Sequence, residues 1–155
     1  MTPACVALDR AGVRYTTHPY DHDPSAGSYG LEAAESLGVE PDRVFKTLMA
    51  TLETGSLVVA IVPVANLLSL KALATAFGTK KAAMANLADA ERSSGYVAGG
   101  ISPFGQRRSS PTAIDESATI CDSIFVSGGR RGLDIELDPA DLITLLAATV
   151  APLAR

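Results

Sequence analysis

The spacing of hydrophobic and polar residues alternates along the chain between the period of a helix and that of a strand. Apolar residues three or four positions apart, after a Ser, Thr or Asp-Pro start and often before a glycine, predict amphipathic helices. Segments in which apolar and β-branched residues alternate with polar ones, or form short apolar runs, predict strands. We expect helices over residues 3–11, 31–37, 70–77 and 87–93, and a last helix that begins after residue 138 and ends the chain. We expect strands over residues 13–17, 44–52, 57–63, 82–84, 112–114, 123–127 and 133–137.

The order and spacing of these elements predict the fold class. Only Glu-Thr-Gly-Ser separates the strands 44–52 and 57–63, which predicts a hairpin. Residues 18–29 and 95–111 are rich in Gly, Pro, Ser and Asp and are expected to be irregular. Several of the six or seven strands are connected too closely for parallel crossovers, so we expect an α+β fold on a mixed, largely antiparallel sheet or barrel. The 155 residues are expected to form a single domain, 1–155.

Composition narrows the class of protein. Apolar residues make up 47% of the chain and charged residues 19%, which is typical of globular proteins and unlike disordered ones. The start lacks the features of a signal peptide and no run of about 18 apolar residues could span a bilayer, so we expect a soluble, cytoplasmic protein. Cys5 and Cys121 lie far apart without a Cys-x-x-Cys spacing, which favours two free thiols over a disulfide framework or a thiolate metal site.

The charge of the chain is unevenly distributed. The net charge is −4, but residues 67–131 carry eight basic and five acidic side chains, a local charge of +3. Three basic pairs lie there in turn-like contexts: Lys80-Lys81, Arg107-Arg108 and Arg130-Arg131. They either converge on one phosphate-binding surface or are scattered over the solvated exterior, and the sequence pattern leaves both interpretations open.

Lys46 is the least expected residue, because it places an ammonium group within the apolar strand Val-Phe-Lys-Thr-Leu-Met. Burial of such a charge requires compensation. Either the side chain extends from a sheet edge to solvent, or the cation is directed at a phosphate, carboxylate or carbonyl oxygen of a ligand. The pattern alone does not separate these two interpretations.

Glycine-rich turns and a pair of strand carboxylates are weaker candidates. Residues 99–105 and 127–132 could bring backbone N–H groups close to a ligand, although neither segment matches a phosphate-binding or dinucleotide-binding motif. Strand alternation places Asp134 and Glu136 on the face opposite the apolar residues, which is typical of a solvated face. Two such carboxylates could also act as acid and base.

The sequence argues against a metal site and a hydrolytic triad. His18 and His22 are the two histidines of the chain, and Pro19 between them opposes the helical spacing of a zinc site. No Gly-x-Ser-x-Gly motif occurs, and both histidines belong to one loop, so a Ser-His-Asp arrangement has little support. We therefore expect no cofactor and no metal, and any catalysis would depend on positioning and electrostatics.

Five segments in their order and spacing resemble a known family. They are TPA at 2–4, HPYDHDP at 18–24, VFKTL at 44–48, GYVAGGISPFGQ at 95–106 and FVSGGRRGLDIEL at 125–137. The chain resembles the YbaK/EbsC-type Cys-tRNA(Pro) deacylases, which are related to the editing domain of bacterial prolyl-tRNA synthetases. The resemblance spans nearly the whole chain and implies a mixed β-barrel surrounded by helices.

The resemblance also implies roles for individual residues. Lys46 matches the essential lysine of the family, which is expected to anchor the 3'-terminal adenosine of the aminoacyl-tRNA and to orient the ester. Gly99 matches the position whose backbone helps to hold the scissile carbonyl. The implied substrate-binding residues are Tyr20, Tyr29, Thr47, Ser127 and Asp134.

The implied mechanism takes its nucleophile from the substrate, because the cysteinyl thiol attacks its own ester and leaves as a cyclic thiolactone. The implied partners are the 3' acceptor end of an aminoacyl-tRNA and prolyl-tRNA synthetase, with no DNA and no membrane. Two alternatives stay open: a sibling deacylase for another mischarged tRNA such as Ala-tRNA(Pro), and a non-catalytic module that binds tRNA or a synthetase.

Overall fold

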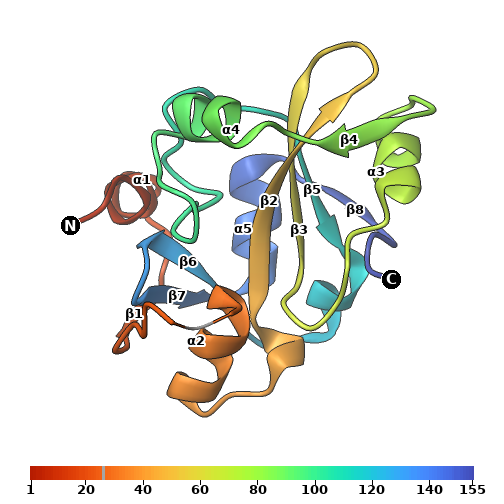
Figure 1. Ribbon diagram of the computed structural model, residues 1–155. Coiled ribbons are helices and arrows are strands. Elements are labelled where there is room, and N and C mark those ends of the chain that lie inside the picture. The colour runs from red at the N-terminus through yellow and green to blue at the C-terminus, as the bar shows by residue number, and fades with distance from the viewer. Residues whose placement is uncertain (26) are drawn as a thin grey trace.

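The computed structural model describes residues 1–25 and 27–155 (Figure 1). These residues form five α-helices and two short 3-10 helices: α1 (Pro3–Ala11), α2 (Tyr29–Leu37), η1 (Pro41–Arg43), α3 (Leu70–Ala76), α4 (Leu87–Ser94), η2 (Glu116–Ile120) and α5 (Pro139–Leu146). They also form eight strands: β1 (Thr16–Pro19), β2 (Phe45–Leu52), β3 (Leu57–Pro63), β4 (Ala82–Met84), β5 (Thr112–Asp115), β6 (Ile124–Arg130), β7 (Leu133–Leu137) and β8 (Thr149–Ala151). No helix within these residues is long and apolar enough to cross a bilayer.

Side-chain caps explain why the helices begin where the sequence predicts. Thr2 accepts a hydrogen bond from the Cys5 amide at the start of α1, and α1 ends at Gly12 with a φ of 70°. Ser69 and Asp138 cap α3 and α5 in the same way. The N-cap Ser28 places the start of α2 two residues before the predicted one.

The strands form two sheets. The three-stranded sheet has the order β1-β7-β6 with antiparallel pairs throughout, and the five-stranded sheet has the order β4-β2-β3-β5-β8. In the larger sheet, β2 pairs antiparallel with β3 and β4, whereas β5 is parallel to both β3 and β8. The predicted α+β class, the predicted hairpin and the largely antiparallel pairing are confirmed.

The predicted closed barrel is wrong, because the described strands form two open sheets. The sheets meet at one isolated bridge, where Val44 pairs with Phe125. Beyond this bridge β2 pairs only with β3 and β4, and β6 pairs only with β7. The strand count of six or seven is also too low, since the described residues form eight.

The expectation that the chain ends in a helix is also wrong. Ala147 adopts a left-handed conformation with a φ of 48° that ends α5, and β8 then pairs with β5. The Asp115 carboxylate holds the tail by accepting the backbone N–H groups of Leu153 and Ala154, each at 2.8 Å. β1 begins at residue 16 rather than 13 because its pairing with β7 starts at Thr16.

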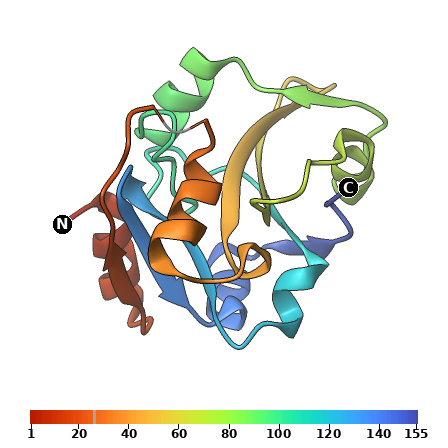
Figure 2. The same cartoon turned by 60° about the horizontal axis from the view of Figure 1, so that its bottom comes forward.

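The buried apolar residues form three clusters, which lie between the sheets, under α3 and under α2. The larger core fills the space between the sheets and contains Phe45, Ile61, Ile135 and Leu142, while α3 covers the outer face of the five-stranded sheet. Figure 2 shows the orange helix α2 over the junction between β2 and β6. There Ala33 and Ala34 of α2 pack with Val44, Val64 and Phe125.

Candidate functional site

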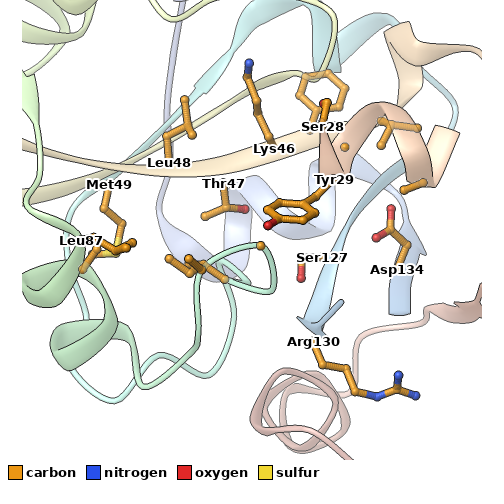
Figure 3. Close-up of a pocket in the computed structure, with 18 of the residues that line it drawn as sticks. Ser28, Tyr29, Lys46, Thr47, Leu48, Met49, Leu87, Ser127, Arg130 and Asp134 are labelled. Carbon is orange, nitrogen blue, oxygen red and sulfur yellow. The ribbon is translucent and has the colours of Figure 1, made fainter. Parts of the chain in front are cut away.

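A pocket of about 440 Å³ opens beside β2 near the junction of the two sheets (Figure 3). It is walled by β2, the start of α2, the start of α4, the loop after α4, and residues of β6 and β7. Every site residue that the family resemblance implies lines this pocket: Tyr20, Tyr29, Lys46, Thr47, Gly99, Ser127 and Asp134. The structure thus brings together seven residues that are spread over 115 positions of the chain (20 to 134), while their individual roles stay predictions.

The pocket lies along an edge of β2 that lacks a neighbouring strand. β4 covers β2 only at residues 50–52, and the bridge to β6 covers it only at Val44. The Met49 carbonyl accepts the Ala85 amide on this side, and alternate residues of a strand direct their backbone groups the same way. The N–H and C=O of Thr47 therefore face the open edge and are available to a ligand.

Lys46 and Thr47 are neighbours in sequence but extend to opposite sides of β2. Figure 3 shows Lys46 and Leu48 on one side of the strand, with Thr47 and Met49 on the side of Ser127 and Asp134. The Thr47 hydroxyl is buried and has no hydrogen-bond partner among the described residues. A buried hydroxyl without a partner is uncommon, and the role of Thr47 in binding a ligand stays a prediction.

Lys46 is a half-buried cation without a counter-charge. No carboxylate among residues 1–25 and 27–155 forms an ion pair with it. Burial lowers the pKa of the Lys46 ammonium from its ordinary value, because desolvation disfavours the charged form. Binding of a ligand oxygen by Lys46 therefore stays a prediction, and no carboxylate among the described residues competes for its ammonium group.

Asp134 departs from the solvated face that strand alternation suggests. Its side chain is only 5% exposed, and burial raises its pKa from 3.8 to about 7. Tyr20 lies in the same part of the pocket, where burial and then the Asp134 charge raise the pKa of its phenol. β7 is covered on both faces, so the prediction of a solvated Asp134 is wrong, whereas Glu136 is part-exposed.

Ser127 lines the pocket near Asp134, and Gly132 holds the adjoining loop. The Ser127 hydroxyl accepts the Gly129 amide at 3.1 Å, which leaves its own proton free to donate. The Gly132 carbonyl accepts the Tyr20 amide at 2.9 Å and so fixes the backbone of the loop that carries Tyr20. Ser127 also lies opposite Asp134 in the antiparallel pairing of β6 and β7.

Gly99 is packed tightly between two side chains. Its φ is +85°, and a Cβ atom there would lie 2.5 Å from Arg131 Nε and 2.9 Å from the Tyr29 ring. The Arg131 guanidinium stacks 4.1 Å from the centroid of the Tyr29 ring and donates through Nε to the Ala98 carbonyl at 3.2 Å. Arg131 therefore joins α2 to the loop that carries Gly99.

Sequence reasoning missed this role of Arg131, which it treated only as one half of a basic pair. It also missed the apolar rim of the pocket, where Met84 and Leu87 are about half exposed, and the basic residue Arg130. The exposure of these apolar side chains depends on tertiary packing, so no pattern in the sequence indicated this rim.

The two histidines form carboxylate pairs. His18 Nε2 lies 2.9 Å from Glu136, which Arg43 also contacts, and His22 Nδ1 lies 2.9 Å from Glu32 of α2. The second pair holds the loop before α2 against the helix. No group of three or more potential metal ligands occurs in the described part of the chain. Cys5 and Cys121 are free, as the sequence predicts.

Comparison with known proteins identifies relatives over most of the chain. Residues 24–145 match the aminoacyl-tRNA editing domain family. EbsC of Enterococcus faecalis (strain ATCC 700802 / V583), a proposed Cys-tRNA(Pro)/Cys-tRNA(Cys) deacylase, is 45% identical over 112 residues, which cover 72% of this chain and 68% of EbsC.

Solved structures support the fold. The hypothetical protein APE2540 superposes with a TM-score of 0.88 at 20% identity over 99% of both chains. A proposed trans-editing enzyme for prolyl-tRNA synthetase superposes with a TM-score of 0.84 at 23% identity, over 99% of this chain and 95% of that one. At these identities the likeness concerns the fold alone.

Proposed function

Because the chain belongs to the aminoacyl-tRNA editing domain family, we propose that it is a trans-editing deacylase that removes cysteine mischarged on tRNA(Pro). The observation that carries this proposal is a pocket of about 440 Å³ that is lined by the buried carboxyl group of Asp134 and by Lys46, whose cation has no ion-pair partner among the described residues. This volume is in the range of pockets that enclose small ligands, such as an aminoacylated nucleoside. The whole of residues 1–155 acts as one editing domain.

Each end of the substrate has a counterpart in the pocket. Lys46 binds the 3'-terminal adenosine of the tRNA, and Tyr29 contacts the substrate beside the apolar rim. The Gly99 backbone holds the scissile carbonyl, and its N–H group donates to no atom among the described residues. Asp134 accepts the α-ammonium group of the amino acid, which would compensate the burial of its own charge.

The remaining residues fix the aminoacyl group between these ends. Thr47 and Ser127 each have a hydroxyl proton that no atom of residues 1–25 and 27–155 accepts, and both lie on the same side of β2 as Asp134 (Figure 3). Tyr20 contacts the substrate from the loop after β1. Orientation by several fixed groups lowers the entropy that the reaction must overcome.

Such a pocket does not need a protein nucleophile. The cysteinyl thiol attacks its own ester carbonyl, a carbon–sulfur bond forms, and the bond from that carbon to the ribose oxygen breaks. The thiol proton is transferred to the departing ribose oxygen, and cysteine leaves as a four-membered thiolactone. The protein folds the substrate into the attacking geometry and stabilises the negative charge that develops on the carbonyl oxygen.

The experiment that tests the proposal is deacylation of Cys-tRNA(Pro) by wild type and Lys46→Ala, with Lys71→Ala as a control on an exposed helix position. Loss of a hydrogen bond to a charged group predicts a fall in kcat/KM of about 10- to 100-fold for Lys46→Ala, with the thermal unfolding temperature preserved. Unchanged turnover in this variant would contradict the assigned role of Lys46. Identification of the product distinguishes thiolactone from free cysteine.

Parallel assays separate the alternatives. Faster turnover of Ala-tRNA(Pro) than of Cys-tRNA(Pro) would assign a sibling editing activity, which cannot use a substrate thiol. Tight tRNA binding without cleavage of cysteinyl, alanyl or seryl esters would assign a binding module. Addition of prolyl-tRNA synthetase tests whether that enzyme is a partner, through the effect on the preference for tRNA(Pro).

A further inference from the structure

A second cavity, of about 510 Å³, lies on another side of α4 from the pocket. Three arginines line it: Arg92 on α4, and Arg107 and Arg108 at the end of the irregular loop that follows α4. Its other wall is the end of the β2–β3 hairpin, at residues 51–57. Both members of the basic pair Arg107-Arg108 line this cavity, whereas Arg130 of the pair Arg130-Arg131 lines the pocket, so these two basic pairs do not line one common cavity.

The charge in this cavity is only partly neutralised. Arg92 pairs with Asp89 at a distance of 3.0 Å, and Asp89 is the one acidic residue in the lining. Arg107 and Arg108 form no ion pair with any carboxylate in the described part of the chain. Three guanidinium groups and one carboxylate leave two positive charges, which suits an anion that accepts several hydrogen bonds.

The cavity also contains a buried hydroxyl without a partner. Ser93 is 9% exposed and lines the cavity, and its Oγ is buried with no hydrogen-bond partner among the described residues. A buried polar atom in a native protein normally has a partner, so a ligand atom that accepts the proton of this hydroxyl would stabilise the site. Its position beside the arginines makes an oxyanion the matching ligand.

The arginines are held in place by their backbones. The amides of Arg107 and Arg108 donate to the carbonyls of Ser94 and Ser93, each at 2.9 Å, which ties the loop to the end of α4. The Arg107 stem also lies against Gly95, where an added Cβ would be 3.4 Å from Arg107 Cβ. These contacts fix the backbone positions of the two arginines at the rim of the cavity, while both residues stay exposed to solvent and to a ligand.

The position of the cavity relative to the pocket indicates the source of the oxyanion. Leu87 and Ala90 of α4 line the pocket, whereas Arg92 and Ser93 line the cavity, so one helix about 10 Å wide separates the two. β2 is a second shared wall, with Met49 in the pocket and Thr51 in the cavity. A nucleic-acid strand carries one phosphate about every 3.4 Å along the axis of a duplex. A strand that ends in the pocket therefore has phosphates within reach of the cavity.

We propose that this cavity binds a backbone phosphate of the tRNA whose 3' end enters the pocket, through Arg107, Arg108 and the Ser93 hydroxyl. The inference rests on the proposed function, because it takes the ligand in the pocket to be the end of an RNA strand. The cavity supplies affinity for the RNA body and takes no part in breaking the ester. This division gives the two sites separate experimental signatures.

The first experiment compares Arg107→Gln/Arg108→Gln with Lys71→Gln/Arg155→Gln, a control that removes two exposed positive charges near α3 and the C-terminus, away from α4 (Figure 1). Binding of uncharged tRNA is measured over a range of salt concentrations. We expect the arginine variant to bind at least about tenfold more weakly, with a salt dependence of log K that is shallower by about 1 for each phosphate that the variant no longer binds. A slope and affinity equal to those of the control would overturn the inference.

The second experiment measures deacylation of Cys-tRNA(Pro) and of a cysteinyl-adenosine ester that lacks the RNA body. The arginine variant should show a raised KM with an unchanged kcat on the tRNA, and wild-type kinetics on the adenosine ester. An equal loss on both substrates would overturn the inference, because it would place the arginines in the catalytic pocket. If wild type cleaves neither ester, the proposed function fails, whereas the binding experiment still tests the cavity.

Ser93→Ala provides a variant that separates a binding role from a structural one. Removal of an unpartnered buried hydroxyl should leave the unfolding temperature unchanged or higher, while tRNA binding weakens by about tenfold if the hydroxyl donates to a phosphate. Unchanged tRNA binding would remove Ser93 from the site. Titration with inorganic phosphate and with AMP tests the source of the anion. Binding of either at micromolar concentration, with tRNA binding unaffected by the arginine variant, would replace RNA by a free phosphate ligand and overturn the inference.

Discussion

Asp134→Asn is the substitution that most directly tests how the pocket is built, because the two side chains have nearly the same shape and differ in charge. Burial raises the pKa of Asp134 from 3.8 to about 7. The folded protein therefore holds a proton on Asp134 over a range of pH in which the unfolded chain has lost it. Stability should fall as the pH rises from about 4 to about 7 and then become constant, since the folded state binds more protons in that range.

The magnitude follows from the difference in pKa. Each pKa unit corresponds to about 1.4 kcal/mol, so ionisation of Asp134 destabilises the folded protein by about 4 kcal/mol above pH 7. Asparagine stays neutral and avoids this loss. We expect the stability difference between Asp134→Asn and wild type to grow by about 3 kcal/mol between about pH 4.5 and about pH 8, or by about 9 °C in Tm.

Thermal and urea unfolding at several pH values measure this difference. Asp122→Asn is the matched control, because it makes the same change in side-chain chemistry at an exposed position of the chain. The same variant should lose deacylation by about 10- to 100-fold at about pH 8, where wild type presents a carboxylate to the substrate ammonium. A stability difference that stays constant with pH would refute the assignment of Asp134 as a carboxyl group that is neutral in the free protein below pH 7.

Two further substitutions test other walls of the pocket. Thr47→Val removes, at nearly constant shape, a hydroxyl that has no partner among the described residues. The unfolding temperature should be unchanged or higher, while kcat/KM falls by about tenfold. Unchanged kinetics would show that the substrate does not use this hydroxyl. Gly99→Ala places a methyl group against Arg131 and the Tyr29 ring at a φ of +85°, and should destabilise the protein by about 1–3 kcal/mol and reduce activity. If Gly99→Ala retains full activity in the deacylation assay, the close packing of Tyr29 on Gly99 has no part in function.

Local signals made most of the secondary structure predictable. The pairs Thr2-Pro3 and Asp138-Pro139 and the single Ser69 locate three helix starts, because each side chain accepts a backbone N–H group that the first turn leaves free. The strand 57–63 and the short strand 82–84 are confirmed without change. Strands whose position depends on a pairing partner are less predictable from local sequence. β1 starts three residues after its predicted start, and β8 is not predicted at all, because pairing with β7 and β5 determines where these strands lie.

The site residues were predicted through resemblance to a family, while their surroundings were not. The alternation of β7 gives no sign that the polar face carrying Asp134 is covered, because the covering elements come from distant parts of the chain. Nor does a basic pair reveal that Arg131 stacks on Tyr29 while Arg107 and Arg108 line a separate cavity. These differences depend on tertiary packing, which local patterns do not contain.

The failure of the barrel prediction has the same cause as the presence of the site. A closed barrel would pair the edge of β2 with β6 along its length and would satisfy the backbone groups of Thr47 with another strand. The sheets instead separate after the bridge between Val44 and Phe125, and the unpaired stretch of β2 becomes a wall of the pocket. On this edge, Thr47 offers a backbone donor, a backbone acceptor and a hydroxyl that has no partner among the described residues. The preceding residue, Lys46, offers a cation from the other side of the strand. The open edge thus leaves the backbone groups of Thr47 facing the pocket that Lys46 also lines, whereas a strand paired on both sides would cover them.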